Sequence, residues 1–235
     1  MHTGHNFKSS LIKGMGFITS AIILAIIFSN VSERRLKEGR FISVKGLAEW
    51  EVDADIGIWD IKFNMTADSL NEINKAITTQ SNIIVAFLNK KKFSKENIIY
   101  GVPQIEDRLC YGRRPGEVGP RYNCEMTITL RSHDVANVYA TLQQSSELVA
   151  DGVVLVRNWD RDTNFLFTSL NKIKPAMIKE ATINAKKAAA QFEHDAHIQV
   201  GAIRNATQGT FSIEKTYMPT KKKVRVVTTM QYYIQ

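Results

Sequence analysis

The residues best suited to chemistry gather around one loop. Cys110 and Cys124 are the only cysteines in the chain, and they stand on either side of the segment 111–123. A segment of that length can fold back as a hairpin and bring the two sulfur atoms together. In an oxidising compartment the resulting disulfide would close a loop of about 15 residues and contribute roughly 3 kcal/mol of stability. The alternative is a pair of buried free thiols, because Cys124 lies on the apolar face of a predicted strand.

The same loop is rich in arginine. It begins YGRRPGEVGPRY and places Arg113, Arg114 and Arg121 close to two tyrosines. Guanidinium groups beside aromatic rings are typical of an anion site or a protein contact. A solvated loop of ordinary turn residues has the same composition, so both interpretations stay open. Three arginines alone do not predict a nucleic-acid site, and no helix-turn-helix, RNA-binding or zinc-finger spacing accompanies them.

Two smaller groups of polar residues have simpler interpretations. His194 and His197 are three residues apart near a predicted helix end and can hold two positions of a metal ion, but the helix dipole also favours histidines there. Asp53 and Asp55 lie in a predicted hairpin turn, where aspartates usually serve the turn itself. No sequence motif for catalysis, metal binding or a cofactor is present. We therefore predict no catalytic residues, no metal, no cofactor and no enzymatic activity.

The spacing of apolar residues predicts the elements that position these groups. Strands are predicted at residues 41–52, 59–65, 98–105, 122–130, 153–156, 165–167, 198–213 and 224–234. Three helices are predicted, one from the capping box of Ser69 and Glu72 to the run Lys90–Lys92, one from a cap at Ser132 or Asp134 to Gly152, and one over residues 171–197. The order ββαββαββαββ indicates an α+β fold with antiparallel sheets and helices packed on one side.

The N-terminal region predicts contact with a membrane. Residues 11–28 are largely apolar, and the unbroken part runs for about 14 residues, which is short for a membrane span and typical of a signal sequence. No convincing cleavage site follows. We therefore predict an uncleaved signal anchor or transmembrane helix over residues 1–30, a linker over 31–39 and one domain over 40–235. The alternative is a cleaved signal and a soluble periplasmic domain.

The charges leave the side of the membrane open. The chain carries a net charge of +8, and basic residues at 34, 35, 37 and 40 follow the apolar segment. By the positive-inside rule these charges would keep the domain in the cytoplasm. A disulfide between Cys110 and Cys124 would instead place it outside. The positive charge is otherwise scattered, so we expect no nucleic-acid partner.

Four stretches of the chain resemble the SIMPL-domain family, also known as DUF541, of the bacterial cell envelope. These are the strand 42–53, which begins ISVKG, the strand and cap 123–135, the alanine- and lysine-rich helix 181–192 and the closing strand 224–233. Their order and spacing carry the resemblance from about residue 40 onward. Val200-Gly201 stands where family members usually have Leu-Gly, and the cysteine-flanked arginine loop does not belong to the family core.

The resemblance implies a location and a way of working. SIMPL-domain proteins are mostly exported, periplasmic or membrane-associated, some form ring-like oligomers, some are linked to oxidative stress tolerance, and no catalytic residues are attached to the fold. We therefore expect a non-enzymatic envelope protein, held at the inner membrane by residues 11–28 with its domain in the periplasm. We expect it to act as a homo-oligomer or through an envelope protein partner. The alternative is a periplasmic domain that binds a small molecule or anion through the loop 111–123.

Overall fold

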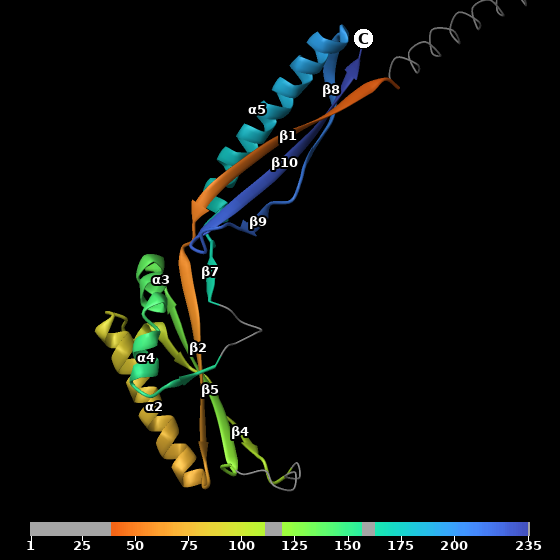
Figure 1. Ribbon diagram of the computed structural model, residues 1–235. Helices are drawn as coiled ribbons and strands as arrows, with labels where there is room; N and C mark the ends of the chain where they lie inside the picture. Colours follow the sequence, from red (N-terminus) through yellow and green to blue (C-terminus); the bar gives the residue numbers. More distant parts are fainter. Residues whose placement is uncertain (1–38, 111–118, 157–162, 235) are drawn as a thin grey trace, which may run out of the picture. The chain divides into compact units, whose positions relative to one another are not determined.

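The structure is a computed structural model in which residues 39–110, 119–156 and 163–234 are described (Figure 1). Across these ranges the chain has the predicted α+β fold, with antiparallel sheets and four α-helices. The predicted anchor at residues 11–28 lies outside the described ranges. Within them, no helix is long and apolar enough to cross a membrane.

The described residues form two compact units. Unit 1 contains residues up to Ala48, Pro175–Phe211 and residues from Val226 onward. Unit 2 contains Glu49–Lys174 and Ser212–Arg225. Each unit is assembled from segments far apart in the sequence, so neither corresponds to one continuous stretch of chain.

Unit 2 is built on a long antiparallel pair of strands. β2 (Ile56–Ala67) and β5 (Tyr122–Ser132) pair over their full lengths, from Gly57 opposite Ser132 to Ala67 opposite Tyr122. Short strands flank this pair on both edges. Beside β5 lie β3 (Ile98–Tyr100) and β4 (Gln104–Asp107), and beside β2 lie β6 (Val154–Leu155) and β7 (Asn164–Leu166).

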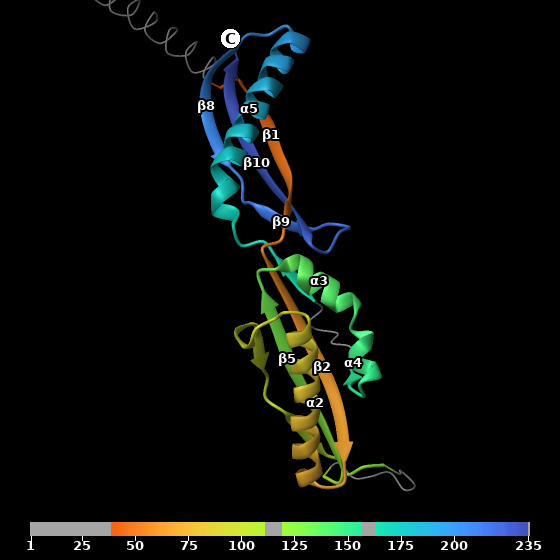
Figure 2. The same cartoon turned by 90° about the vertical axis from the view of Figure 1, so that its left-hand side faces the viewer.

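Three α-helices cover one face of the β2–β5 sheet, as the two views show (Figures 1 and 2). They are α2 (Leu70–Lys90), α3 (Val135–Gln143) and α4 (Ser146–Ala150), and a short 3₁₀ helix η1 (Lys95–Asn97) follows α2. The predicted capping box is confirmed, because Ser69 accepts from the Glu72 amide and the Glu72 carboxylate accepts from the Ser69 amide. Asp134 caps α3 by accepting from the Asn137 amide.

The prediction of three helices was wrong for the second one. Residues predicted as one helix up to Gly152 form α3 and α4 instead. Around Gln144 and Ser145 the backbone bonds run to the third preceding residue, so the α-helical ladder is interrupted. The helix resumes so that Leu148 is fully buried and Glu147 reaches Lys91, with 2.7 Å between carboxylate and ammonium. Gly152 ends the segment with φ +85°, as predicted for a helix stop.

Two predicted strands are also divided. The strand predicted at 98–105 becomes β3 and β4, because the Gly101 amide bonds to Thr127 O and Pro103 has no amide hydrogen to continue the ladder. The strand predicted at 198–213 becomes β8 (Val200–Gln208) and β9 (Ser212–Lys215).

The core of unit 2 comes from the alternation that the sequence predicts. One face of β2 and one face of β5 bury large apolar side chains against the helices. Its central members are Trp59, Ile61, Phe63, Met65, Met126, Ile128, Leu130, Ile73, Ile84 and Leu88. Burying one such side chain stabilises the folded state by about 1.5–3 kcal/mol. The apolar faces therefore hold β2, β5 and α2 together.

The second sheet has the order β1–β10–β8, with β9 also paired to β10. It is formed by β1 (Phe41–Asp53), β10 (Lys221–Ile234), β8 and β9, and α5 (Leu170–Ala196) lies along one face of it (Figure 2). The predicted alternation of β1 and β10 is confirmed by their buried residues. In unit 1 the core joins Ile42 and Val44 of β1 to Met230 and Tyr232 of β10.

The backbones of α5 and β1 approach each other closely because the side chains between them are small. α5 buries Met177, Ala181, Ala185 and Ala189. A Cβ atom on Gly46 would lie 2.0 Å from Ala181 O and 2.2 Å from Ala185 N. Phe192, one turn beyond this buried face, is 44% exposed.

Candidate functional site

The foot of the predicted arginine loop is a paired and hydrogen-bonded structure. β4 pairs with β5 so that Ile105 lies opposite Cys124 and Asp107 lies opposite Tyr122. One step further along, the Arg108 amide donates to Arg121 O at 3.0 Å. The antiparallel pair therefore fixes where the chain leaves for the loop and where it returns.

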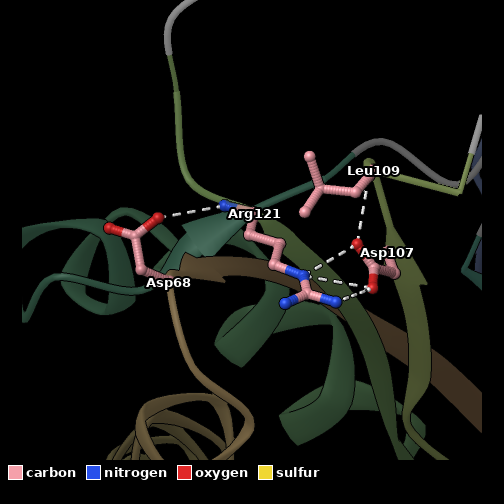
Figure 3. Close-up of polar contacts among 4 residues, drawn as sticks. All are labelled: Asp68, Asp107, Leu109 and Arg121. Atoms are coloured by element: carbon pink, nitrogen blue, oxygen red, sulfur yellow. Dashed lines mark hydrogen bonds and ion pairs between the residues drawn. The ribbon is translucent and has the colours of Figure 1, made fainter. Parts of the chain in front are cut away.

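Arg121 is held by Asp107 at this foot (Figure 3). Nη2 of Arg121 lies 2.7 Å from Oδ2 of Asp107, and Nε lies 3.1 Å from each carboxylate oxygen. This ion pair raises the pKa of the Arg121 guanidinium. The guanidinium also lies 4.8 Å from the centre of the Tyr122 ring, where a cation–π contact is favourable.

Two backbone amides complete the foot of the loop. The Leu109 amide donates to Oδ1 of Asp107 at 3.0 Å, and the Arg121 amide donates to Oδ1 of Asp68 at 3.1 Å. Figure 3 shows Asp107 at the end of β4 and Leu109 just after it, Arg121 just before β5, and Asp68 in the segment before α2. The arrangement closes the base of the loop and pairs the guanidinium of Arg121 with the carboxylate of Asp107.

Of the three arginines predicted to form a contact site, only Arg121 lies among the described residues. Arg121 forms a structural ion pair, while Arg113 and Arg114 lie outside the described residues. The sequence alone does not predict this ion pair, because Asp107 lies 14 residues from Arg121. Strand register, which brings residue 107 opposite 122, is what joins them.

The predicted disulfide is not present in the structure. Cys110 and Cys124 are both free, Cys110 being exposed and Cys124 buried. The physical reason is the direction of each side chain: Cys124 belongs to the core face of β5, whereas Cys110 follows Asp107 in an exposed turn closed by the bond from the Cys110 amide to Asp107 O. Burial raises the pKa of the Cys124 thiol, and the charge of Glu125 adds to this shift. The alternative of free thiols therefore fits Cys124.

Asp55 has a structural role over a long sequence distance. Its carboxylate accepts from the Thr168 amide at 2.8 Å, the Thr168 hydroxyl at 3.1 Å and the Ser169 amide at 2.8 Å. These residues directly precede α5, so Asp55 satisfies amides at the start of that helix. Burial raises the pKa of the Asp55 carboxyl, but the bonds from Thr168 and Ser169 outweigh burial and hold its pKa below 3.8.

His133 lies next to the same turn. Its Nδ1 is 2.9 Å from Asp55 O, so it links the end of β5 to the connection between β1 and β2. Asp53 and Asp55 were predicted as turn residues, and the long-range bonds of Asp55 to His133 and to the residues before α5 were not predicted. Asp55 and Thr168 are 113 residues apart, so their spacing in the sequence does not predict that one caps the other.

The histidines near the end of α5 also serve local structure. His194 pairs with Asp195, with 3.0 Å between Nδ1 and Oδ1. His197 has φ 52° and follows the last helical residue, which is the conformation that commonly ends a helix. The Glu193 carboxylate accepts from the Val200 amide at 3.2 Å. In the ranges that the structure describes, no three His, Cys, Asp or Glu side chains are grouped so that they could hold a metal ion.

Comparison with known protein families finds one family model that matches the chain. The family model SIMPL, described as a protein of unknown function (DUF541), matches residues 42–232. The match extends over most of the chain and across both compact units, so the chain belongs to the SIMPL (DUF541) family. A comparison with curated proteins found no match.

Two features of the contact between β1 and α5 explain parts of the family pattern in this chain. The glycine of ISVKG is Gly46, which lets β1 approach the backbone of α5 at Ala181 and Ala185. The alanine-rich stretch of α5 supplies the other side of that approach. The motif therefore has a packing role, and no catalytic role is needed to account for it.

Proposed function

We propose that this chain is a non-enzymatic envelope protein that acts through contacts with copies of itself or with other proteins. The observation that supports the proposal is a set of exposed apolar side chains on and beside the edge strands β3 and β4 of unit 2. These are Ile99, Tyr100, Val102, Ile105 and Leu109, with exposed fractions of 48–83%. Large apolar side chains that stay exposed along a sheet edge are typical of protein interaction sites.

The roles of the polar side chains agree with a non-enzymatic protein. Asp107 and Arg121 fasten the foot of a loop, and Asp55 caps the start of α5. Lys62 and Glu125 form an ion pair at 2.6 Å on the face of the β2–β5 sheet. Each of these groups has a structural partner, so the proposal assigns none of them to catalysis.

The proposed location is the periplasmic side of the inner membrane, with residues 11–28 as an uncleaved anchor. Membership of a family whose proteins are mostly exported supports this location. Alkaline phosphatase fused to the C-terminus of the full chain tests it, because this enzyme folds only outside the cytoplasm. Active fusions support export, and inactive fusions of normal abundance contradict it. Fractionation of the same cells separates an anchored chain from a cleaved, soluble one.

We also propose a part in oxidative stress tolerance, which rests on the family alone. Cells lacking the chain should survive peroxide less well than the parent, and the full chain should restore survival. Equal survival of the two strains contradicts this part of the proposal and leaves the assembly part standing.

Sedimentation equilibrium of the full chain in density-matched detergent tests the assembly part. In such a solvent the detergent does not contribute to the buoyant mass, so the measured mass is that of the protein. We expect the mass of several chains at high protein concentration and a lower mass on dilution, because the assembly dissociates. A single-chain mass at every concentration contradicts assembly.

A further inference from the structure

One face of the sheet in unit 1 is left uncovered. α5 packs on the face that buries Ile42 and Val44 of β1, and among the described residues no helix lies on the opposite face (Figures 1 and 2). Because successive side chains of a strand point to opposite faces, the exposed residues of β1 in unit 1 lie there. We call this surface the open face, and its aromatic, large apolar and basic residues are Phe41, Lys45, Leu47, Arg204 and Tyr233.

The open face carries positive charge and no negative charge. The strand segments 41–48, 200–208 and 226–234, which form the sheet in unit 1, contain no Asp or Glu. Their basic residues are Lys45 and Arg204, which are both exposed. Among the described residues no carboxylate forms an ion pair with either of them, whereas farther along the same strands Lys221 pairs with Glu51 at 2.9 Å. The open face therefore suits an anionic partner.

Arg204 lies beside two aromatic rings of the open face. Its guanidinium carbon is 4.2 Å from the centre of the Phe41 ring and 6.0 Å from the centre of the Tyr233 ring. A cation–π contact uses the charge of the guanidinium and not its N–H donors, which stay available for the oxygen atoms of a phosphate. Aromatic rings beside basic side chains are typical of protein surfaces in the head-group layer of a membrane.

The open face begins where the chain arrives from the predicted anchor. Phe41 is the first residue of β1, and only residues 29–40 separate it from the apolar segment 11–28. Even fully extended, a segment of this length spans about 40 Å at most. A chain anchored by residues 11–28 therefore keeps the open face close to the bilayer. The phosphate groups of the bilayer surface are a nearby partner that matches the charge of this face.

We propose that the open face of unit 1 lies against anionic phospholipid head groups, with Lys45 and Arg204 against phosphate and Phe41 in the interfacial layer. This inference rests on the proposed membrane anchor and names the surface by which the domain meets the bilayer. Each basic residue held at an anionic surface strengthens such a contact about fivefold. A contact of two basic residues is weak by itself, and it suffices here because the anchor already holds the domain near the lipid.

The full chain reconstituted in lipid vesicles tests this contact. A fluorescent amino acid replaces Ser43, which is exposed on the open face, and lipids with a spin-labelled head group quench its fluorescence at short range. The same amino acid at Ile183 is the matched control, because Ile183 is exposed on α5, on the other side of the sheet. The vesicles contain phosphatidylcholine alone or phosphatidylcholine with phosphatidylglycerol, which is anionic.

Two double variants separate the open face from the charge of the whole chain. Lys45→Gln with Arg204→Gln removes two positive charges from the open face. Lys186→Gln with Lys187→Gln removes the same charge from the exposed surface of α5. All four side chains are exposed, so circular dichroism should show an unchanged fold in both variants.

Residue 43 should be quenched in anionic vesicles and much less in neutral ones, while residue 183 should be quenched little in either. The variant of Lys45 and Arg204 should lower the equilibrium constant of the contact about 25-fold, because it loses two factors of about five. The variant of Lys186 and Lys187 should change it less than about twofold. Salt at about 1 M should release residue 43 as well, because it shortens the screening length to about 3 Å.

Contrary results separate this contact from the anchor. A full chain that does not float with the vesicles overturns the anchor in the proposed function. A chain that floats while residue 43 stays unquenched overturns the contact of the open face and leaves the anchor standing. Equal quenching in neutral and anionic vesicles, or an equal loss from both double variants, overturns recognition of anionic lipid by this face. Because the vesicles have no cytoplasmic side, these outcomes do not depend on the compartment that the fusion experiment assigns.

Discussion

At the scale of single residues, carboxylates fasten connections between distant parts of the chain. Asp107 holds Arg121 at the foot of a loop, and Asp55 holds the residues that begin α5. Neither pairing can be predicted from spacing in the sequence. The register of β4 on β5 brings Asp107 to Arg121, and the fold of the chain brings Asp55 to the start of α5. The capping box of Ser69 and Glu72, in contrast, was predictable because its two partners are three residues apart.

Asp55→Ala should lower the free energy of unfolding by about 1 kcal/mol, the usual effect of losing a side chain that caps a helix. The effect should depend on pH. Because the folded pKa of Asp55 lies below its ordinary value of 3.8, its contribution is present above that value and is lost as pH falls through the folded pKa. Urea unfolding at about pH 7 and about pH 3 measures both effects. An equal difference between wild type and variant at the two pH values would contradict this role.

Asp107→Ala should speed hydrogen exchange of the Leu109 amide, which donates to the Asp107 carboxylate. The expected change is about fivefold, the factor that one hydrogen bond of ordinary net strength provides. Asp68→Ala is the matched variant, and it should act on the Arg121 amide instead. Exchange measured residue by residue separates the two. Equal acceleration of both amides by either variant would mean that the foot of the loop opens as one unit.

At the scale of elements, alternation and caps were predictable and interruptions were not. The buried faces of β1, β5 and β10 follow from the period of two in their apolar residues. The break between α3 and α4 has no glycine or proline to mark it and depends on how Leu148 is buried. The strand predicted over residues 98–105 is divided into β3 and β4 at Pro103, which has no amide hydrogen to continue the ladder.

Gly46→Ala should strongly destabilise unit 1. The added methyl group would meet backbone atoms of α5 at 2.0 and 2.2 Å, and a helix backbone cannot move aside as a flexible side chain can. We expect a loss of about 3 kcal/mol or more, the upper end for overpacking. Ser43→Ala, on the exposed face of the same strand, should change stability by less than about 0.5 kcal/mol. Thermal unfolding compares the two, and similar melting temperatures would contradict the close approach.

At the scale of the whole molecule, the family and the fold class were predictable from four separated stretches. The match to the SIMPL family over residues 42–232 confirms that prediction. Residues 40–235 were treated as one domain, whereas contacts group the described residues into two units made of distant segments. Composition shows no linker between such units because β1, α5 and β10 each contribute residues to both.

Contact with other protein chains is the central claim, and one measurement in living cells tests it directly. A photoreactive benzoylphenylalanine placed at residue 102 of the full chain forms a covalent bond to whatever lies against it. The same group at residue 192 is the control, since both positions are exposed. We predict that irradiation of intact cells gives a protein adduct from position 102, of twice the chain's mass if the partner is a second copy, and none from position 192. Chains that stay monomeric from both positions would contradict a protein contact at this edge of unit 2.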